Sequence, residues 1–575
     1  MATPTVLPAD TLYAPPTPPP VDAAVRDRGP LVVSRAGWLI REALLASLLL
    51  GVTIGLQVAA GAYQSERNSY SDEAAHFMNA LVLRDYIREG LSQNPLRFAE
   101  DYYRHYPKIA PGMWPPLFST AVAVLMLPGW PPQSATFAFL ALLSAWAAWR
   151  LHRFIRSFST SAIAAILTGV FCVIPAIVEL TTAAMVDLLI LALALEATHW
   201  LARFFSTGRT RDALLFGLFS TLCCLSKGNG LALAFLPLVL AVITRRYDRL
   251  ATLDLYIAAA MVAVVAGPPM AVAYRLDAAI GDFGTVHGHD IIERLVLYST
   301  SVWRQFGPAL VALALIGFVA AVVPGRRAAL SGASANKAAL AALVVAGLLF
   351  HLVNPHLIAA PRYMVMVYPA LLALVPIGID ALASIVRSES ARQPVRIAIL
   401  LAAVAGFVTA APAVPLRQSL GARATVDFIE QSRGLPNSKT LVVSDEYGEG
   451  AMVSEVARRH PTPRATVIRG SKFIATEDWA GNRFRLHYES PAALLADIEA
   501  LHIDFVVMDY SPNAAGLRFG SLVRSMIDTS PSRLEPVFET QAARRLVTYR
   551  LKYRTPGVSK VLEVPVLYSL GRVLK

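Results

Sequence analysis

The sequence is poor in charge and in cysteine. Of its 575 residues 16% are charged and 55% are hydrophobic, a balance that excludes a soluble globular domain of this size. The three cysteines, Cys172, Cys223 and Cys224, all lie in apolar segments. We interpret them as small buried residues, which excludes a disulfide framework and a cysteine metal site.

The sequence contains long apolar runs. Residues 43–63, 157–178 and 397–415 contain no charged side chain, and a membrane-spanning helix needs about 20 mainly apolar residues. Closed β-barrels lack such runs. The sequence therefore predicts a polytopic α-helical membrane protein with about 11 to 13 transmembrane helices and a C-terminal extracytoplasmic α/β domain.

The positive charges have a topological pattern. A net charge of +12 suggests nucleic acid at first, but the arginines gather in alternate connections, and such clusters face the cytoplasm. We therefore expect no nucleic-acid partner, a plasma (inner) membrane protein, a cytoplasmic N-terminus and an extracytoplasmic C-terminal domain. The clusters are Arg150, Arg153, Arg156; Arg203, Arg209, Arg211; Arg245, Arg246, Arg249; Arg326, Arg327; and Arg387, Arg392, Arg396.

Three parts are expected along the chain. Residues 1–35 are Pro-rich and predict a disordered cytoplasmic tail. Residues 36–416 predict the transmembrane domain, with an external loop at 63–113 that carries amphipathic helices lying in the membrane interface. Residues 417–575 predict an α/β domain, because short strands alternate with helices there. The expected strands are 441–444, 466–468, 505–508 and 546–551, with helices at 450–459 and 491–501.

Asp72 and Glu73 directly follow the first apolar segment. Two adjacent carboxylates at the mouth of a membrane span suggest a general base or a cation site if they are partly buried. Alternatively, Ser71 or Asp72 caps the next helix and Glu73 complements its dipole. Both acids are candidate catalytic residues, with Asp72 favoured.

Basic and polar residues at the predicted external ends of later spans are candidate substrate-binding residues. Lys227 either reaches the lipid headgroups or pairs with a lipid phosphate. Arg362, with Tyr363 and the nearby His351 and His356, either makes bidentate contacts to a phosphate or anchors the helix at the interface. Asp187 lies inside a span, where it would orient a sugar hydroxyl or pair with Lys227.

Metal and dinucleotide sites are weakly indicated. His287, His289 and Asp290 form a His-x-His group without the further ligands that a zinc site needs. Gly448 and Gly450 follow an expected strand but lack the third glycine of a dinucleotide loop. We therefore expect no metal and no cofactor.

The order of these motifs resembles a known family. Asp72-Glu73, Trp114-Pro115-Pro116, Met185-Val186-Asp187, Ser226-Lys227-Gly228 and Pro361-Arg362-Tyr363 occur in one succession. In this succession of motifs, the chain looks like the C-type fold (GT-C) membrane glycosyltransferases, which include protein O-mannosyltransferases and the lipid A aminoarabinose transferase. The resemblance covers residues 35–420.

The resemblance implies an enzyme that transfers a sugar from a polyprenyl-phosphate donor to a lipid, glycan or protein acceptor. The transfer would take place at the outer face of the plasma membrane, and membrane lipids would surround the enzyme. Asp72 would take the proton of the acceptor hydroxyl. The residues around the acids, Tyr70-Ser71 and Ala74-Ala75-His76, depart from the family's pattern. The alternative is a transporter or flippase of lipid-linked sugars, which internal repeats would favour; the sequence shows none.

Overall fold

The computed structural model describes most of the chain from residue 35 onward. Residues 46–575 form one compact unit, which contains the candidate site and the sheet described below. The described ranges are 35–67, 69–280, 288–323, 331–354, 361–410, 413, 415–433, 438–460, 465–476, 484–552, 560–565 and 573–574.

The membrane part is built from long apolar helices, which confirms the predicted polytopic helical class. Seven spans among the described residues are long and apolar enough to cross a membrane. They are α1 (Arg35–Ala59), α5 (Pro132–Arg156), α8 (Asp187–Thr207), α11 to α12 (Leu253–Leu276), α13 (Gly288–Val322), α14 (Gly332–Val353) and α16 (Glu389–Ala410).

Shorter helices fill the remaining predicted spans. α6 (Ser161–Val173) and α7 (Pro175–Thr182) pass the same test together but are bent by 58° at Ile174. Only if this pair and the three shorter apolar helices all cross does the number reach the lower end of the expected range. These three are α4 (Leu117–Met126), η2 to α10 (Gly228–Thr244) and α15 (Tyr368–Ala383).

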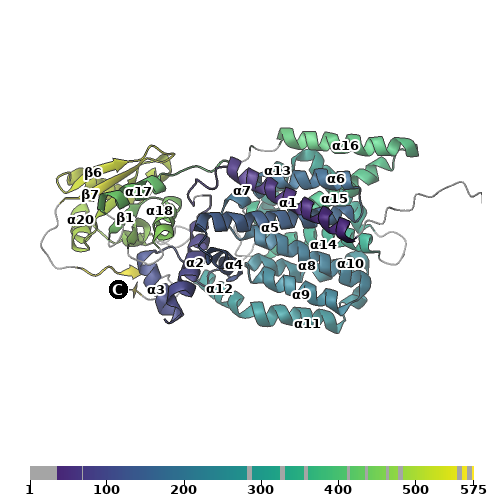
Figure 1. Ribbon diagram of the computed structural model, residues 1–575, viewed down its shortest axis with the longest axis horizontal. Helices are drawn as coiled ribbons and strands as arrows, with labels where there is room; N and C mark the ends of the chain where they lie inside the picture. The colour runs from purple at the N-terminus through teal and green to yellow at the C-terminus, as the bar shows by residue number, and fades with distance from the viewer. Residues whose placement is uncertain are drawn as a thin grey trace, which may run out of the picture. The chain divides into compact units, whose positions relative to one another are not determined.

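Helix α8 is the centre of the bundle. Of its most apolar 18 residues 83% are buried, whereas the corresponding values are 11% for α11 to α12 and 17% for α16. It packs against α5, α14 and α9 (Thr210–Cys224), as Figure 1 shows for α5 and α9. A helix that is apolar on all sides is suited to such a place. The first residue of α8, Asp187, is thereby held in the protein interior.

Two glycines permit the closest helix contact. A Cβ on Gly317 of α13 would lie 2.0 Å from the carbonyl oxygen of Leu374, and one on Gly378 of α15 would lie 2.1 Å from that of Leu313. Any larger residue would push the two helices apart. This contact fixes α13 against α15 and, with it, the segment η5 (Pro361–Met364) that precedes α15.

The segment between α1 and α5 folds into helices, but the first is not interfacial as expected. α2 (Glu73–Asp85) continues into η1 (Tyr86–Gly90) and is followed by α3 (Pro95–His105). All but one residue of α2 are buried, because it packs against α4 and α18. Its charged residues Arg84 and Asp85 are buried and pair with each other at 2.6 Å.

The C-terminal region contains the predicted strands, in a sheet of order β2-β1-β5-β7-β6. β1 pairs in parallel with β2 and β5, whereas β7 pairs antiparallel with β5 and β6. The edge strand β6 is absent from the prediction. The strands are β1 (Lys439–Val443), β2 (Thr466–Arg469), β5 (Phe505–Asp509), β6 (Leu534–Glu539) and β7 (Leu546–Leu551), with short pairs β3 (Ala475–Thr476) with β4 (Arg485–Leu486) and β8 (Val564–Pro565) with β9 (Val573–Leu574).

Helices cover both faces of this sheet (Figure 1). Leu441 and Val443 of β1 and Val506 and Met508 of β5 point into a core that α20 (Pro491–Ala500) and α22 (Gly520–Thr529) complete. On the other face α18 (Glu446–Arg459) packs on β1 and β2, and α17 (Ala422–Arg433) packs on β6 and β7. Burial on both faces explains why the central strands are apolar without alternation.

Candidate active site

The ion pair between Asp72 and Arg362 joins the start of α2 to η5. Arg362 Nη2 lies 3.1 Å from Asp72 Oδ2. Asp72 occupies the N-cap position of α2, yet its side chain accepts no capping hydrogen bond from the described residues. The capping explanation therefore fails for this residue. Burial alone would raise the pKa of Asp72, but Arg362, and less strongly neighbouring cations, lower it below its ordinary value.

Arg362 has donors to spare. Its guanidinium lies over the rings of Tyr70 and Tyr363, at 4.5 and 5.3 Å from the ring centroids. Its Nε and Nη1 are buried and have no hydrogen-bond partner among the described residues. Buried donors are nearly always paired, and an unpaired one costs about 1–3 kcal/mol. Two free donors of a fixed planar group suit a bidentate anion.

A second ion pair lies beside Tyr363. Lys227 Nζ is 3.2 Å from Asp187 Oδ1 and 4.7 Å from the centroid of the Tyr363 ring. The other carboxylate oxygen of Asp187 is buried without a partner among the described residues. Gly230 fixes the turn that carries Lys227, because a Cβ there would lie 2.6 Å from the backbone of Cys223.

Glu73 faces a different partner from its neighbour. It is fully buried, and Arg417 Nη2 donates to its two carboxylate oxygens at 3.0 and 3.1 Å. The backbone amides of Ser69 and Ala184 donate to it at 2.8 and 3.1 Å. Both oxygens are therefore occupied. Arg417 was missed as a site-region residue by sequence reasoning, although a lone arginine directly after the last apolar run was a visible signal.

His76 is a further residue that sequence reasoning did not assign. It lies one helical turn after Asp72, and its ring is 4.3 Å from the Trp114 ring. Burial lowers its pKa to about 4, so its imidazole is neutral at pH 7. Its Nε2 is buried without a partner among the described residues. The i, i+4 spacing from Asp72 was the available signal.

Lys108 connects this region to α18. Its Nζ lies 3.5 Å from the carbonyl oxygen of Glu446, and burial lowers its pKa to about 7. A Cβ on Gly450 of α18 would lie 2.9 Å from Ala74 Cβ and 3.3 Å from Lys108 Cε. Gly450, the second glycine of the weak dinucleotide pattern, thus allows α18 to approach α2 closely.

The structure brings together five of the predicted site residues from segments far apart in the sequence: Asp72, Asp187, Lys227, Arg362 and Tyr363. Glu73 follows Asp72 in the sequence but is held by Arg417. His356 lies outside the described residues.

Among the described residues no group of three His, Cys, Asp or Glu side chains is placed to hold a metal ion.

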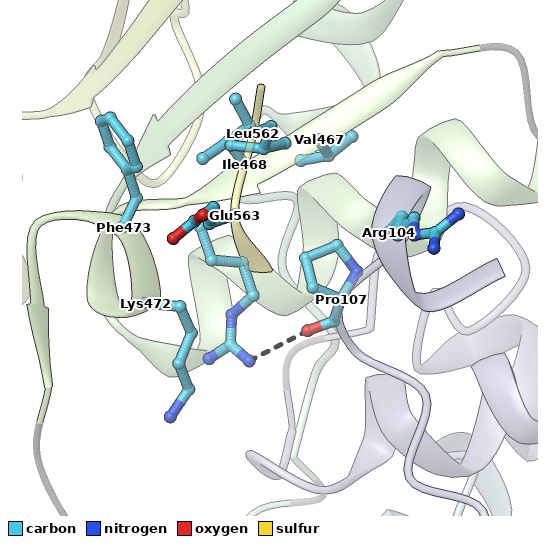
Figure 2. Close-up of a pocket in the computed structure, with 9 residues that line it drawn as sticks. Arg104, Pro107, Val467, Ile468, Lys472, Phe473, Leu562 and Glu563 are labelled. Atoms are coloured by element: carbon cyan, nitrogen blue, oxygen red, sulfur yellow. Dashed lines mark hydrogen bonds between the residues drawn. The ribbon is translucent and has the colours of Figure 1, made fainter. Parts of the chain in front are cut away.

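Two cavities lie elsewhere. Figure 2 shows a cleft of about 20 Å³ between Pro107 and β2, where Arg469 donates to the Pro107 carbonyl oxygen at 3.2 Å. It has room for little more than one water molecule. A cavity of about 480 Å³ lies between α4, α5, α8 and α9. Its lining is apolar and includes Leu117, Phe139, Trp146, Leu189 and Phe219.

The chain shares its fold with known membrane enzymes. No family model and no curated protein matches it. Solved structures do: ArnT from Cupriavidus metallidurans bound to undecaprenyl phosphate is 12% identical, covering 90% of this chain and 98% of that one, with a TM-score of 0.52. The Archaeoglobus fulgidus oligosaccharyltransferase in its apo form is 11% identical, covering 81% and 69%, with a TM-score of 0.51.

The same oligosaccharyltransferase tethered with an acceptor peptide is 10% identical to this chain, covering 89% and 74%, with a TM-score of 0.51. At these identities the likeness concerns the fold. It confirms the expected C-type fold of a polytopic membrane protein with a C-terminal domain.

Proposed function

We propose that this protein is an integral membrane glycosyltransferase that takes a sugar from a polyprenyl-phosphate donor. Arg362 and Lys227 bind the donor phosphate, and Asp72 receives the proton of the acceptor hydroxyl. Glu73, locked to Arg417, acts as a positioning residue that fixes the start of α2. The acceptor is a lipid, glycan or protein at the outer face of the plasma membrane.

One observation carries the proposal: the guanidinium of Arg362 keeps Nε and Nη1 free among the described residues, beside the ammonium of Lys227. Tyr363 lies against both cations. A dianionic or monoanionic phosphate would satisfy the two donors and compensate the buried charge. When the donor's anomeric bond breaks, negative charge grows on that same phosphate, so these cations stabilise the transition state more than the ground state.

The proposed chemistry is a displacement at the anomeric carbon. The acceptor oxygen forms the new bond to carbon while the bond to the phosphate oxygen breaks, and the polyprenyl phosphate leaves with the electron pair. The proton of the hydroxyl passes to Asp72. The lowered pKa of Asp72 keeps it ionised at neutral pH, so it is free of a proton when the acceptor binds, and it also makes Asp72 a weak base that takes the proton as the new bond forms. A transporter would use the cations but would have no need of this base.

The apolar cavity supports a lipid donor. It opens between α4, α5, α8 and α9, and Leu189 and Leu193 of its lining lie on α8 beyond Asp187, within the membrane part. The amide of Leu117, at its edge, donates to the carbonyl oxygen of Leu225 at 3.0 Å. Because Leu225 lies two residues before Lys227, we propose that a prenyl chain in this cavity has its phosphate at the turn that carries Lys227. ArnT, which shares the fold, binds undecaprenyl phosphate.

The test is the Asp72→Asn variant in a single-turnover assay with radiolabelled lipid-linked sugar in native membranes. We expect transfer to fall by about 10²–10⁴-fold, while binding of undecaprenyl phosphate to the purified protein stays near wild type. Asp101→Asn is the matched control, because it removes an exposed acid from the same loop. Transfer by Asp72→Asn within about threefold of wild type would eliminate Asp72 as the base.

The proposed orientation has its own test. With the N-terminus in the cytoplasm, the arginine clusters place the C-terminal domain outside. Alkaline phosphatase fused after Lys575 should be active in cells. A fluorescent protein fused there should be non-fluorescent, because it would be exported unfolded. A fluorescent fusion without phosphatase activity would reverse the topology and place the site at the cytoplasmic face.

A further inference from the structure

A buried polar pair lies next to Tyr363. Tyr298 of α13 and His351 of α14 are 1% and 0% exposed, with ring centroids 5.6 Å apart. The Tyr298 hydroxyl and one ring nitrogen of His351 have no hydrogen-bond partner among the described residues, and the other ring nitrogen has only the nearby Tyr363 backbone. Buried polar atoms with so few partners are suited to a ligand that brings its own hydrogen-bonding groups.

The pair is held in place by its surroundings. Arg294, one turn before Tyr298 on α13, donates to the carbonyl oxygens of His351 and Asn354 at the end of α14. It satisfies carbonyls that the helix end leaves unpaired. Because Arg294 and Tyr298 share a helix face, Tyr298 is directed at the same end of α14. The polar atoms are therefore fixed, which is what a binding group needs.

The pair is continuous with the proposed phosphate site. The His351 ring is 6.4 Å from the Tyr363 ring, and Lys227 Nζ lies 4.7 Å from the centroid of the same Tyr363 ring. The two positions differ in chemistry, however. Arg362 and Lys227 offer positive charge, whereas a hydroxyl and an imidazole offer one donor and one acceptor each without a full charge. Such atoms suit neutral hydroxyl groups better than a phosphate.

We propose that Tyr298 and His351 bind hydroxyl groups of the sugar on the donor lipid, and so help to determine which sugar is transferred. The inference rests on the proposed function, since it assumes that the phosphate lies at Arg362 and Lys227. A sugar linked to that phosphate would lie near Tyr363, whose ring contacts both cations. Its hydroxyls would supply the partners that Tyr298 and His351 lack, as a site built to pair with a hydroxyl discriminates strongly.

The experiment measures binding to purified protein in detergent. The probes are undecaprenyl phosphate alone and undecaprenyl phosphate carrying a hexose, an N-acetylhexosamine or a pentose. Wild type should bind one sugar-bearing lipid more tightly than the others. Tyr298→Phe and His351→Phe should each reduce that preference by about 3- to 10-fold, the value of one hydrogen bond, with undecaprenyl phosphate binding unchanged.

Thermal stability separates this role from a structural one. Removing an unpaired buried polar atom should leave the melting temperature unchanged or raise it, whereas removing a paired one lowers it. Ser301→Ala is the control on the same helix: it removes the contact of Ser301 with the Tyr368 hydroxyl at 3.2 Å. It should lower the melting temperature and leave the sugar preference intact.

Three results would overturn the inference: equal binding of all four lipids by wild type, an unchanged preference in both variants, or a lower melting temperature in both with the preference kept. The proposed function fails separately, if wild type does not bind undecaprenyl phosphate and Arg362→Ala changes nothing.

Discussion

Two clusters of buried charged residues in this protein contain the same residue types but differ in how many of their hydrogen-bonding atoms have a partner. The sheet-edge cluster, Ser444, Asp445, Asp509, Ser511 and Arg544, lies where β1 and β5 end. Arg544 donates from both terminal nitrogens, at 2.6 and 2.8 Å to Asp445 and at 3.0 Å to Asp509. The candidate active site instead holds Arg362 by one nitrogen, at 3.1 Å from Asp72.

The carboxylates differ in the same way. Asp509 accepts from Ser444 and Arg544 with one oxygen and from Ser511 with the other. Asp445 also caps α18 through the Gly448 amide at 2.9 Å. In contrast, Asp187 leaves one oxygen without a partner among the described residues. Carboxyl ends of parallel strands are common ligand sites. We call the sheet-edge cluster saturated because all of its carboxylate oxygens have partners and only Arg544 Nε lacks one among the described residues, and we call the candidate active site unsaturated. We propose that the saturated cluster is structural and that the unsaturated one binds substrate.

The largest expected effect breaks the saturated cluster. Arg544→Met leaves Asp445 and Asp509 buried without their cation, which should cost about 3–5 kcal/mol of stability. The measurement is the melting temperature of the purified protein in detergent. Arg545→Met is the control, because this neighbouring arginine is 63% exposed and pairs with an equally solvated Glu539. Equal melting temperatures for the two variants would show that the cluster contributes no more than a surface pair.

The next effect concerns the unsaturated cluster. Arg362→Ala and Lys227→Ala should lower turnover by about 10²–10³-fold. Arg362→Ala should lower the melting temperature less than Arg544→Met, because Asp72 is 26% exposed. Lys227→Ala should lower it about as much as Arg544→Met, because it leaves the buried Asp187 without its cation. Arg362→Lys should restore little, since an ammonium lacks the planar fork that matches two phosphate oxygens. The measurements are donor affinity, turnover per folded molecule and melting temperature.

Variants of Arg362 and Lys227 that lose stability but keep their activity per folded molecule would identify both residues as interface anchors. The donor phosphate would then bind elsewhere, and the contrast between the two clusters would lose its functional meaning.

The sequence was sufficient for the class of fold and for the acids at the start of α2. Apolar runs and arginine clusters are local signals, and most predicted spans coincide with helices. The sequence could not show which residues pair with the two acids. Asp72 and Glu73 are neighbours, but their partners lie 290 and 344 residues away. Only the packing of α2, η5 and the segment after α16 decides which acid has spare capacity.

The burial of α2 and the proposed role of Tyr298 and His351 could not be predicted either, because both depend on contacts between distant segments. α2 carries charges at amphipathic spacing, which predicted an interfacial helix, but Arg84 and Asp85 neutralise each other inside the protein. Tyr298 is an ordinary residue of an apolar helix in the sequence, and His351 is marked there only as a neighbour of Arg362 and Tyr363. Their meaning depends on the absence of partners among the described residues, and a missing hydrogen bond leaves no mark in a sequence.

A smaller effect tests the helix that connects the two clusters. α18 begins after Asp445 and approaches α2 at Gly450, where an added Cβ would lie 2.9 Å from Ala74 Cβ. Gly450→Ala should therefore cost about 1–3 kcal/mol through overpacking, seen as a lower melting temperature and slower transfer. Gly516→Ala is the control, because its Cβ would meet no atom within 4 Å. A neutral Gly450→Ala would mean that α18 and α2 are not in firm contact.

The smallest effect is the response of Asp72 to pH. Arg362 lowers the pKa of Asp72 in the folded protein, whereas the unfolded chain has an aspartate pKa of about 3.9. A lowered folded pKa means that the ionised pair stabilises the fold above the unfolded pKa, and that this stability is lost as the pH falls through the folded pKa. The difference in melting temperature between wild type and Asp72→Asn should therefore be constant from pH 8 to about pH 5, and shrink only below about pH 4.

Transfer by wild type should be flat over the same range, because the base stays ionised. If the rate instead falls between pH 7 and 6, burial outweighs Arg362 and the Asp72 pKa is raised. The ion pair would then be weaker than its 3.1 Å distance indicates. Arg362→Met provides the internal comparison: without the cation, burial alone acts on Asp72, so the residual transfer should acquire a pH midpoint above that of wild type. The same midpoint in both proteins would show that another group controls the profile, and that the spare donors of Arg362 are not coupled to the base.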